Sequence, residues 1–289
     1  MGQSATPRDN VLRGGEFFSP VSRRAEDKLF LITELTQPCA RRIPAHTHDL
    51  ASILLVLDGS YGEVEGRSEM DMTAFNAVFN PAGTHHVSLI GDHGTRLLSI
   101  ELRPALLRDA DDLKLPAVPV LDRGTGPLLW HAVRLALAWM QDDSDALSVE
   151  SLIWEMLAGL STRQTKAASP APWFGRVKQK MIAGFDQRLR MSHLAGEAGV
   201  HPVHLAKAFR RIEGQTAGEY LQRLRVRAAC DRLRNSDESL ANLAADYGFA
   251  DQSHFTRTFR KIVGVTPAAF RNVSRPKRFL PANFSTRSN

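Results

Sequence analysis

Hydrogen-bonding side chains gather on one face of a helix that is expected near the C-terminal end of the chain. The residues concerned are Gln252, Ser253, Thr256 and Arg257. Glutamine can form two hydrogen bonds with the edge of adenine, and arginine can form two with the edge of guanine. The first residues of a recognition helix reach base edges in the major groove. These four residues are therefore predicted to contact DNA bases.

A second segment offers equivalent positions with weaker donors. The residues on its reading face are Val203, Ala206 and Lys207. Lys207 is the strong donor among them, whereas Val203 and Ala206 can meet the methyl group of thymine. In both segments basic residues follow where phosphates would lie: Arg210, Arg211, Arg260 and Lys261. We predict phosphate contacts for these four residues, and more hydrogen-bonded readout from the Gln252 segment than from the Val203 segment.

Both segments belong to a repeated unit. Leu194–Val200 aligns with Leu243–Phe249 at an offset of 49 residues, and after a one-residue slip Leu205–Ile212 aligns with Phe255–Ile262. Each unit has a short expected helix, a turn that contains glycine, and a second helix rich in basic residues. This layout is typical of a helix-turn-helix that reads DNA. The sequence thus predicts two such units on one chain.

Capping and turn residues set the expected limits of the surrounding helices. The limits are a leading helix at Trp173–Arg188, a cap at Ser192, reading helices at Pro202–Ile212 and Gln252–Val263, and a spacer helix at Ala217–Leu233. The spacer should turn its leucines inward and its arginines outward, namely Arg223, Arg225, Arg227, Arg232 and Arg234. Two reading helices on a rigid spacer would enter successive major grooves, with boxes about 10 bp apart.

Charge is distributed unevenly along the 289 residues. Residues 1–172 hold 16 Lys and Arg against 22 Asp and Glu, whereas residues 173–289 hold 21 against 9. The formal charge is therefore −6 in the first part and +12 in the second, which together give the +6 of the whole chain. A contrast of this size indicates a polyanionic partner for the C-terminal part. Double-stranded DNA fits that partner best.

The residues from Ala245 to Lys261, continued by Gly264 to Arg271, resemble the signature of the AraC-type transcription regulators. The resemblance spans roughly residues 175–272. It implies a transcription factor with two helix-turn-helix units, often an activator and often responsive to a small molecule. RNA polymerase would be a partner if the protein activates. The first unit is the less typical of the two.

The N-terminal part has the pattern of short strands separated by turns. Candidate strands are Leu29–Leu35, Ser52–Leu57, Tyr61–Val64, Ala77–Phe79, His85–Ile90 and Arg96–Leu102, with turns at Asp58–Ser60 and Gly91–Gly94. Closely spaced strands without intervening helices favour a small β-sandwich or barrel. Two amphipathic helices follow, at Pro127–Met140 and Val149–Leu160. They are expected to pack on their own barrel, with homodimerisation as the second interpretation.

Two short segments of this part resemble the motifs of the cupin barrel. They are Pro44–His48, which holds an H-x-H pair, and Asn80–His86. In cupin enzymes the equivalents of His46, His48 and His86, with a glutamate after the first pair, hold a divalent metal. Here Ser52 or Ile53 occupies the glutamate position, which removes part of the ligand set. We therefore expect these histidines to line an effector pocket, with no metal or other cofactor.

The predicted fold class is α+β multidomain: a cupin-like N-terminal β-barrel with a helical hairpin, and an all-α C-terminal domain with two helix-turn-helix units. The expected division is a flexible N-terminus (1–15), an effector and dimerisation domain (16–162), a linker (163–172), the DNA-binding domain (173–273) and a basic tail (274–289). Only two cysteines occur, and no run of about 18 apolar residues does. A cytoplasmic protein without a membrane partner is predicted.

Two rival interpretations stay open at this point. The first is a metal-dependent cupin enzyme fused to a DNA-binding module, for which the three histidines are the whole case. The second is a constitutive regulator whose barrel only dimerises. The preferred prediction is a sequence-specific, DNA-binding transcription regulator without enzyme activity. An unknown small-molecule effector in the barrel would control it.

Overall fold

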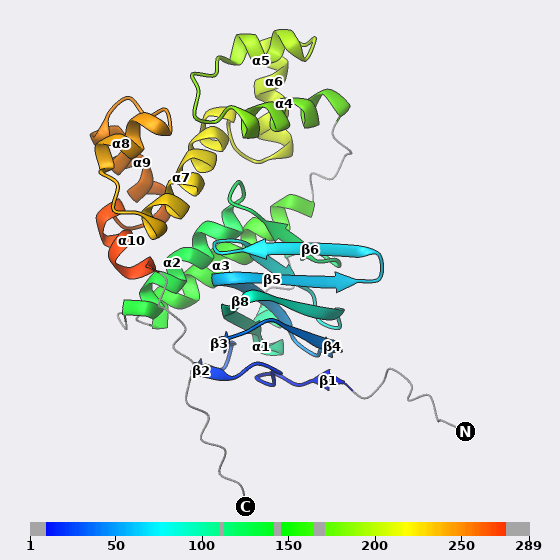
Figure 1. Ribbon diagram of the computed structural model, residues 1–289. Helices are drawn as coiled ribbons and strands as arrows, with labels where there is room; N and C mark the ends of the chain where they lie inside the picture. Colours follow the sequence, from blue (N-terminus) through cyan, green and yellow to red (C-terminus); the bar gives the residue numbers. More distant parts are fainter. Residues whose placement is uncertain (1–9, 110–112, 142–145, 165–170, 276–289) are drawn as a thin grey trace, which may run out of the picture.

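A computed structural model describes residues 10–109, 113–141, 146–164 and 171–275. Residues 10–164 form a β domain, which combines one large sheet with helices, and residues 171–275 are helical (Figure 1). The predicted fold class is confirmed by this arrangement. Within the described ranges, every helix is too short or too polar to span a membrane.

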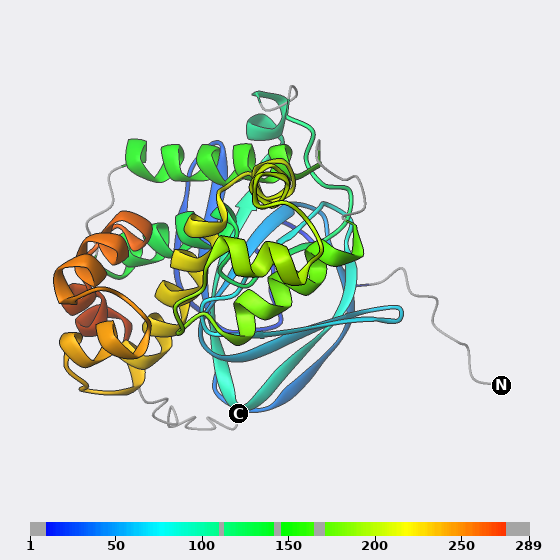
Figure 2. The same ribbon diagram turned by 90° about the horizontal axis from the view of Figure 1, so that it is seen from above.

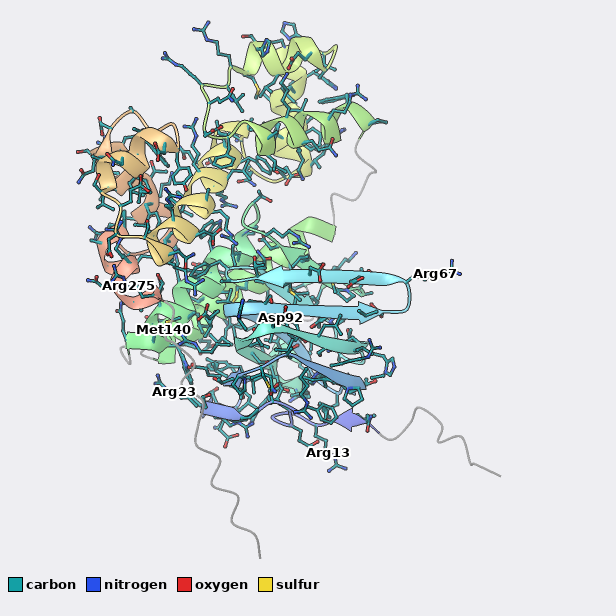
Figure 3. All side chains as sticks on the ribbon, in the orientation of Figure 1. Arg13, Arg23, Arg67, Asp92, Met140 and Arg275 are labelled. Atoms are coloured by element: carbon teal, nitrogen blue, oxygen red, sulfur yellow. The ribbon has the colours of Figure 1, made fainter. Side chains whose placement is uncertain are left out.

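In the described part of the chain the sheet consists of nine strands, most of them antiparallel. Their limits are β1 Val11–Leu12, β2 Val21–Glu26, β3 Phe30–Gln37, β4 Arg41–His48, β5 Ala51–Glu65, β6 Ser68–Thr73, β7 Ala77–Asn80, β8 His85–Leu102 and β9 Val120–Asp122. The strand order along the main path is β1-β4-β8-β5-β7-β9, with β3 beside β8, β2 beside β3 and β6 beside β5. Arg67 projects from the tip of the β5–β6 hairpin (Figure 3).

Two of the predicted turns are wrong, because β5 and β8 each continue through them. The pairing of these strands shifts register between Val56 and Asp58 and again between Gly59 and Tyr61. Gly59 has a φ of 75°, and a Cβ atom there would lie 2.0 Å from the carbonyl oxygen of Gly94. Glycine permits both the left-handed backbone and the close approach of the two strands. The glycines therefore form a bulge inside a long strand pair, not the end of a strand.

Helices cover part of the sheet. They are α1 Pro104–Asp109, α2 Pro127–Gln141 and α3 Ala146–Gln164. Both predicted amphipathic helices are confirmed, although α3 is longer than expected. The carboxylate of Asp122 accepts hydrogen bonds from the backbone N–H groups of Gly124, Gly126 and Leu129, and this fixes the start of α2. Apolar residues surround α2 on most sides, so this helix is largely buried, as predicted.

Seven helices make up residues 171–275. They are α4 Pro172–Ala183, α5 Met191–Glu197, α6 Pro202–Ile212, α7 Ala217–Asn235, α8 Leu240–Asp246, α9 Gln252–Val263 and α10 Pro267–Ser274. The limits of both reading helices agree with the prediction. The leading helix stops at Ala183 and not at Arg188, and α5 begins at Met191, so Ser192 lies inside the helix and does not cap it.

The apolar cores do not coincide with the division into the β domain and the helical residues 171–275. One core joins the sheet, α2 and α3 to α7, α8, α9 and α10, and it includes Phe75, Cys230, Phe255 and Phe270. A separate core holds α4, α5, α6 and the start of α7 together around Phe209. In Figures 1 and 2 the α8–α9 pair accordingly lies against the side of the α2–α3 pair, whereas α4, α5 and α6 stand above the sheet.

The predicted domain limits need one correction at the N-terminal end. Residues 10–15 were expected to belong to a flexible extension, but β1 pairs in parallel with β4 through Val11 and Leu12. This pairing places the segment on the sheet. Residues 1–9, most of the expected linker and nearly all of the expected tail lie outside the described residues. Both cysteines are free thiols, Cys39 exposed and Cys230 buried.

Candidate nucleic-acid interface and pocket

The second helix-turn-helix unit consists of α8, a turn at Gly248 and α9. The hydroxyl of Ser239 accepts a hydrogen bond from the N–H of Asn242 at the start of α8, and the carboxylate of Asp251 accepts one from His254 at the start of α9. Gly248 has a φ of 69°, and a Cβ atom there would lie 2.6 Å from the carbonyl oxygen of Asp186. This turn therefore requires glycine.

The inner and outer faces of α9 differ in chemistry. Phe255, Phe259 and Val263 are fully buried in the core that the sheet, α2 and α3 share with α7, α8, α9 and α10. Gln252, Ser253 and Arg257 are exposed, and Thr256 is half-buried beside them. The four residues lie at positions i, i+1, i+4 and i+5 of one helix, so they share a face. The structure thus presents all four predicted base-contacting residues of this unit together on the solvent side.

The first unit, α5 and α6, repeats this geometry with different side chains. Leu205, Ala208 and Phe209 point inward. Val203 has 54% of its surface exposed, Lys207 is exposed, and Ala206 is half-buried. The N-cap of α6 is His201, whose Nδ1 accepts a hydrogen bond from the N–H of Val203 at 3.3 Å. Sequence reasoning missed this cap, because histidine is an uncommon N-cap residue.

The basic residues expected at phosphates lie at the ends of the two reading helices. Arg210 and Arg211 are exposed in the last turn of α6, and Arg260 and Lys261 are exposed in the last turn of α9. The backbone carbonyl of Lys261 accepts a hydrogen bond from Nη2 of Arg134 in α2 at 2.8 Å. The β domain therefore contacts the end of α9 and leaves the side chain of Lys261 exposed.

The spacer helix α7 links the two units rigidly. Thr216 and Glu219 form a capping box at its start, and its 19 residues span roughly 28 Å at 1.5 Å per residue. Its arginines do not all point outward as predicted. Arg225 donates to the carbonyl oxygens of Phe185, Gln187 and Gly248, and so connects α4 and its following loop to the turn of the second unit.

Three further arginines of α7 bind the β domain, and one of them, Arg223, donates to the carbonyl oxygen of Thr125. Arg227 donates to the carbonyl oxygens of Ala74 and Phe75. Arg234 has 6% of its surface exposed and donates to the carbonyls of Leu57 and Ser274 and to the carboxylate of Asp58. The prediction of an outward orientation was wrong for Arg223, Arg227 and Arg234, because these backbone acceptors lie in other elements that no local pattern in α7 reveals.

The side chains of the three predicted pocket histidines lie close together and line one cavity of the β domain. His46 and His48 come from β4 and His86 from β8, and one ring nitrogen of each lies within 4.8 Å of the others. The ring centroids of His46 and His86 are 4.5 Å apart, and those of His46 and His48 are 5.0 Å apart. The register of β4 with β8 places His46 directly opposite His86.

Burial keeps these imidazoles neutral. It lowers the pKa of His48 to about 4 and that of His86 to about 3, and the charge of the neighbouring imidazoles lowers both further. The pKa of His46 is also lowered, chiefly by burial, although its hydrogen bond to the carbonyl of Pro44 opposes the shift. Neutral imidazoles keep a lone pair that can accept a hydrogen bond or bind a metal ion.

Two carboxylates that sequence reasoning missed line the same cavity, of about 50 Å³. Glu63 in β5 has 1% of its surface exposed, and it accepts hydrogen bonds from Tyr61 Oη at 3.0 Å and from Asn80 Nδ2 at 3.1 Å. Burial raises its pKa to about 7. Glu101 accepts a hydrogen bond from the N–H of Gly15, and burial likewise raises its pKa to about 7. Neither residue belongs to a short motif, although alternation along β5 places Tyr61 and Glu63 on one face.

Aromatic rings from the N-terminal segment lie over the histidines. The centroid of the Phe18 ring is 5.3 Å from that of His46, and the Phe17 centroid is 5.9 Å from that of His48. Both phenylalanines precede β2, in a segment for which the sequence predicted no structure. Phe17 and Phe18 form the apolar side of the cavity, and the histidines and carboxylates form its polar side.

Known proteins are similar to about a third of this chain. A family model described as a helix-turn-helix domain matches residues 194–272. The probable transcription factor PqrA of Proteus vulgaris is 35% identical over 86 residues, which cover 30% of this chain and 70% of PqrA. Regulatory protein SoxS of Escherichia coli (strain K12) is 31% identical over 101 residues, 34% of this chain and 94% of SoxS. The bifunctional transcriptional activator/DNA repair enzyme AdaA of Bacillus subtilis is 31% identical over 103 residues, but these cover only 49% of AdaA.

Solved structures give a weaker likeness. The C-terminal domain of AraT from Geobacillus stearothermophilus is 22% identical, with a TM-score of 0.37, and the match covers 41% of this chain and 98% of that one. ToxT from Vibrio cholerae is 11% identical with a TM-score of 0.37, and the match covers 85% of this chain and 99% of ToxT.

Two helix-turn-helix units with exposed polar reading faces define a DNA-binding protein. Together with the relatives that match over most of their own length, they place the chain in the AraC-type family of transcription regulators. The chain is a DNA-binding transcription regulator. The resemblance found in the sequence is thereby confirmed.

Proposed function

We propose that this regulator reads an asymmetric duplex site with α6 and α9, and that a small effector bound in the β domain controls it as a transcription activator. The observation that carries the proposal is the shared geometry of the two reading helices, which expose different side chains on equivalent faces. Different side chains read different bases, so the two boxes of the site need not be palindromic.

Roles of individual residues follow from their positions on these faces. Base contacts are proposed for Val203, Ala206 and Lys207 in α6, and for Gln252, Ser253, Thr256 and Arg257 in α9. Phosphate contacts are proposed for Arg210, Arg211, Arg260 and Lys261. Because Arg225 of α7 binds both the loop that leads into the first unit and the turn of the second unit, the two reading helices should approach the DNA in a fixed relation, with boxes about 10 bp apart.

An effector role for the β domain is supported by the cavity around the histidines and by the contacts of this domain with the second unit. His46, His48 and His86 line the proposed effector pocket. The relatives act as regulators by name, which favours control of transcription over catalysis by this chain. RNA polymerase would be a partner of an activator, and homodimerisation through the β domain stays a prediction.

Selection of random duplex DNA by the full-length protein at near-physiological salt tests this proposal. The expected result is an asymmetric consensus with two boxes about 10 bp apart. The selection is repeated with Arg257→Ala, which should weaken the consensus in one box only. Recovery of a single box, a palindrome or no consensus would contradict the two-helix reading.

A further inference from the structure

The carboxylate of Glu63 keeps an open acceptor position in the cavity of the β domain. A carboxylate offers about four lone-pair positions. Tyr61 Oη donates to its Oε1 at 3.0 Å, and Nδ2 of Asn80 donates to Oε1 at 3.1 Å and to Oε2 at 3.2 Å. Both oxygens of Glu63 are therefore held in place, and Oε2 can accept a further hydrogen bond from a ligand.

Asn80 contributes a second buried acceptor to the same cavity. Only 6% of its surface is exposed, and it is one of the lining residues. The two hydrogen bonds from Nδ2 to Glu63 fix which end of the amide faces the carboxylate. Within the described ranges no donor reaches Oδ1 at the other end. A buried acceptor without a partner calls for a donor from outside the chain, such as a ligand or a water molecule.

His46 adds a third acceptor, because the backbone of its own strand fixes its tautomer. Its Nδ1 lies 2.8 Å from the carbonyl oxygen of Pro44, which can only accept a hydrogen bond. Nδ1 therefore carries the proton of the neutral ring, and Nε2 keeps a lone pair on a ring that lines the cavity. Acceptors from β4, β5 and β7 thus surround the space that a ligand would occupy.

The charge around the cavity is negative. Glu63 and Glu101 line it with 1% of their surface exposed each, whereas no lysine or arginine of the described ranges does so. Arg24 and Arg103 lie near Glu101 and balance part of its charge, but Glu63 has no such basic neighbour in the described part of the chain. A buried carboxylate without a positive partner is unfavourable, so a cation bound beside Glu63 would be stabilised.

The size and the apolar side of the cavity limit the ligand further. A volume of about 50 Å³ holds roughly four water molecules at 10–15 Å³ each. The rings of Phe17 and Phe18 line this space, and the face of an aromatic ring attracts a cation. A cation of roughly four non-hydrogen atoms that carries several N–H donors therefore matches the cavity.

We propose that the effector pocket binds a small organic cation of the guanidinium or alkylammonium class. Glu63 pairs with its charge, while Oδ1 of Asn80 and Nε2 of His46 accept hydrogen bonds from its N–H groups. Glu101 adds a second negative charge, which disfavours carboxylate and phosphate ligands. This inference rests on the proposed effector control, because the cation is identified with the effector of the β domain.

Calorimetric titration of the full-length protein with matched ligands tests the charge that the pocket selects. Guanidinium is compared with urea and ethylammonium with ethanol, because the members of each pair are equal in size, and acetate serves as the anion. The titrations are made at about pH 8, since burial raises the pKa of Glu63 and of Glu101 to about 7 and both carboxylates should be ionised.

The expected result is saturable binding of at least one of the two cations, with one cation bound per chain. Its affinity should exceed that of its uncharged counterpart by roughly 10-fold or more, because a charged donor forms the stronger hydrogen bond to a carboxylate. Absence of saturable binding by both cations would overturn the inference. Equal or tighter binding of the uncharged ligands or of acetate would also overturn it.

Glu63→Gln keeps the size of the side chain and removes its charge, so it should lower the affinity for the cation by roughly 10-fold or more. Glu101→Gln should lower it by less, because Arg24 and Arg103 already balance part of that charge. Glu69→Gln is the matched control, since Glu69 is exposed on β6 and does not line the cavity. Thermal unfolding shows whether each variant is folded. Equal affinity for the cation in folded Glu63→Gln and Glu69→Gln would contradict the assigned role of Glu63.

DNA binding separates this inference from the proposal on which it rests. The affinity for the selected two-box duplex is measured with the chloride of the bound cation and with sodium chloride at equal ionic strength, because salt itself weakens DNA binding. The two values should differ for the unaltered protein and agree for Glu63→Gln. Stoichiometric binding of the cation without an effect on DNA affinity would overturn the effector role. Failure of both cations to bind a protein that still recognises the two-box site would overturn the present inference alone.

Discussion

The ring of Phe75 in the β domain packs against the ring of Phe270 in α10, with 5.3 Å between the two centroids. Phe75 has 3% of its surface exposed and a φ of 59°, an uncommon conformation for a residue other than glycine. The guanidinium of Arg234 lies 5.1 Å from the centre of its ring. Phe75 of the β domain therefore belongs to the same apolar core as the second helix-turn-helix unit.

Removal of the Phe75 side chain should destabilise the core that the β domain shares with the second helix-turn-helix unit. We expect Phe75→Ala to lower the free energy of unfolding by about 3–5 kcal/mol, because it opens a cavity between the β domain and α10. Amide hydrogen exchange of α9 and α10 should rise more than that of α5 and α6, whose core is separate. Denaturant unfolding and exchange by mass spectrometry measure both effects. Val203→Ala, at an exposed position, is the control, and equal exchange in the two units would contradict the account.

Arg234 makes a second connection between the same parts. Replacement by methionine keeps the unbranched apolar part of the side chain but leaves the carbonyls of Leu57 and Ser274 and the carboxylate of Asp58 without this donor. We expect a loss of about 2–3 kcal/mol of stability in urea unfolding. Arg232→Met, which removes the ion pair of exposed Arg232 with half-buried Glu238, should cost less than Arg234→Met. A smaller loss for Arg234→Met than for Arg232→Met would show that the buried contacts do not stabilise the protein.

The two reading helices should differ in the information they contribute. Arg257→Ala should remove about 1–3 kcal/mol of base discrimination at one position of its box, because a bidentate contact with guanine is lost. Lys207→Ala should relax preference in the other box by less. Binding to a library of single-base variants of the selected site measures both. The prediction fails if the lysine variant loses more base preference than the arginine variant.

Basic residues at the ends of the reading helices should act on affinity rather than on specificity. Arg260→Ala is expected to weaken binding equally for all sequences and to lower the slope of log affinity against log salt by about 1, as expected for one lost phosphate contact. Titrations at several salt concentrations with a specific and a scrambled duplex measure this. A change confined to the specific duplex would instead assign Arg260 to a base.

Local signals in the sequence were sufficient to predict the helices of the two helix-turn-helix units. Caps such as Asp251 and Thr266, the glycines of the turns, and the inward phenylalanines act within a few residues of one another, so the limits of α6 and α9 follow from the sequence. The continuity of β5 and β8 could not be predicted from the sequence, because glycines such as Gly59 occur both in turns and in β-bulges.

Contacts between distant parts of the chain had no such signal. Arg227 and Arg234 look like solvent-facing residues of a basic helix, and their acceptors are carbonyl groups of the β domain that any sequence would possess. Glu63 was missed for a related reason. It reaches the histidines from β5 through strand pairing, whereas the sequence pattern directs attention to the residues directly after His48.

Helix α7 should hold the two reading helices in a fixed relation on one face of the DNA. The most direct measurement compares the affinity of the full-length protein for the selected two-box site with its affinity for the same site carrying 5 bp inserted between the boxes. Half a helical turn moves one box to the opposite face. The account predicts that the insertion reduces affinity to that of a duplex with one box scrambled. Unchanged affinity would contradict it, because helices fixed by α7 could not follow the displaced box.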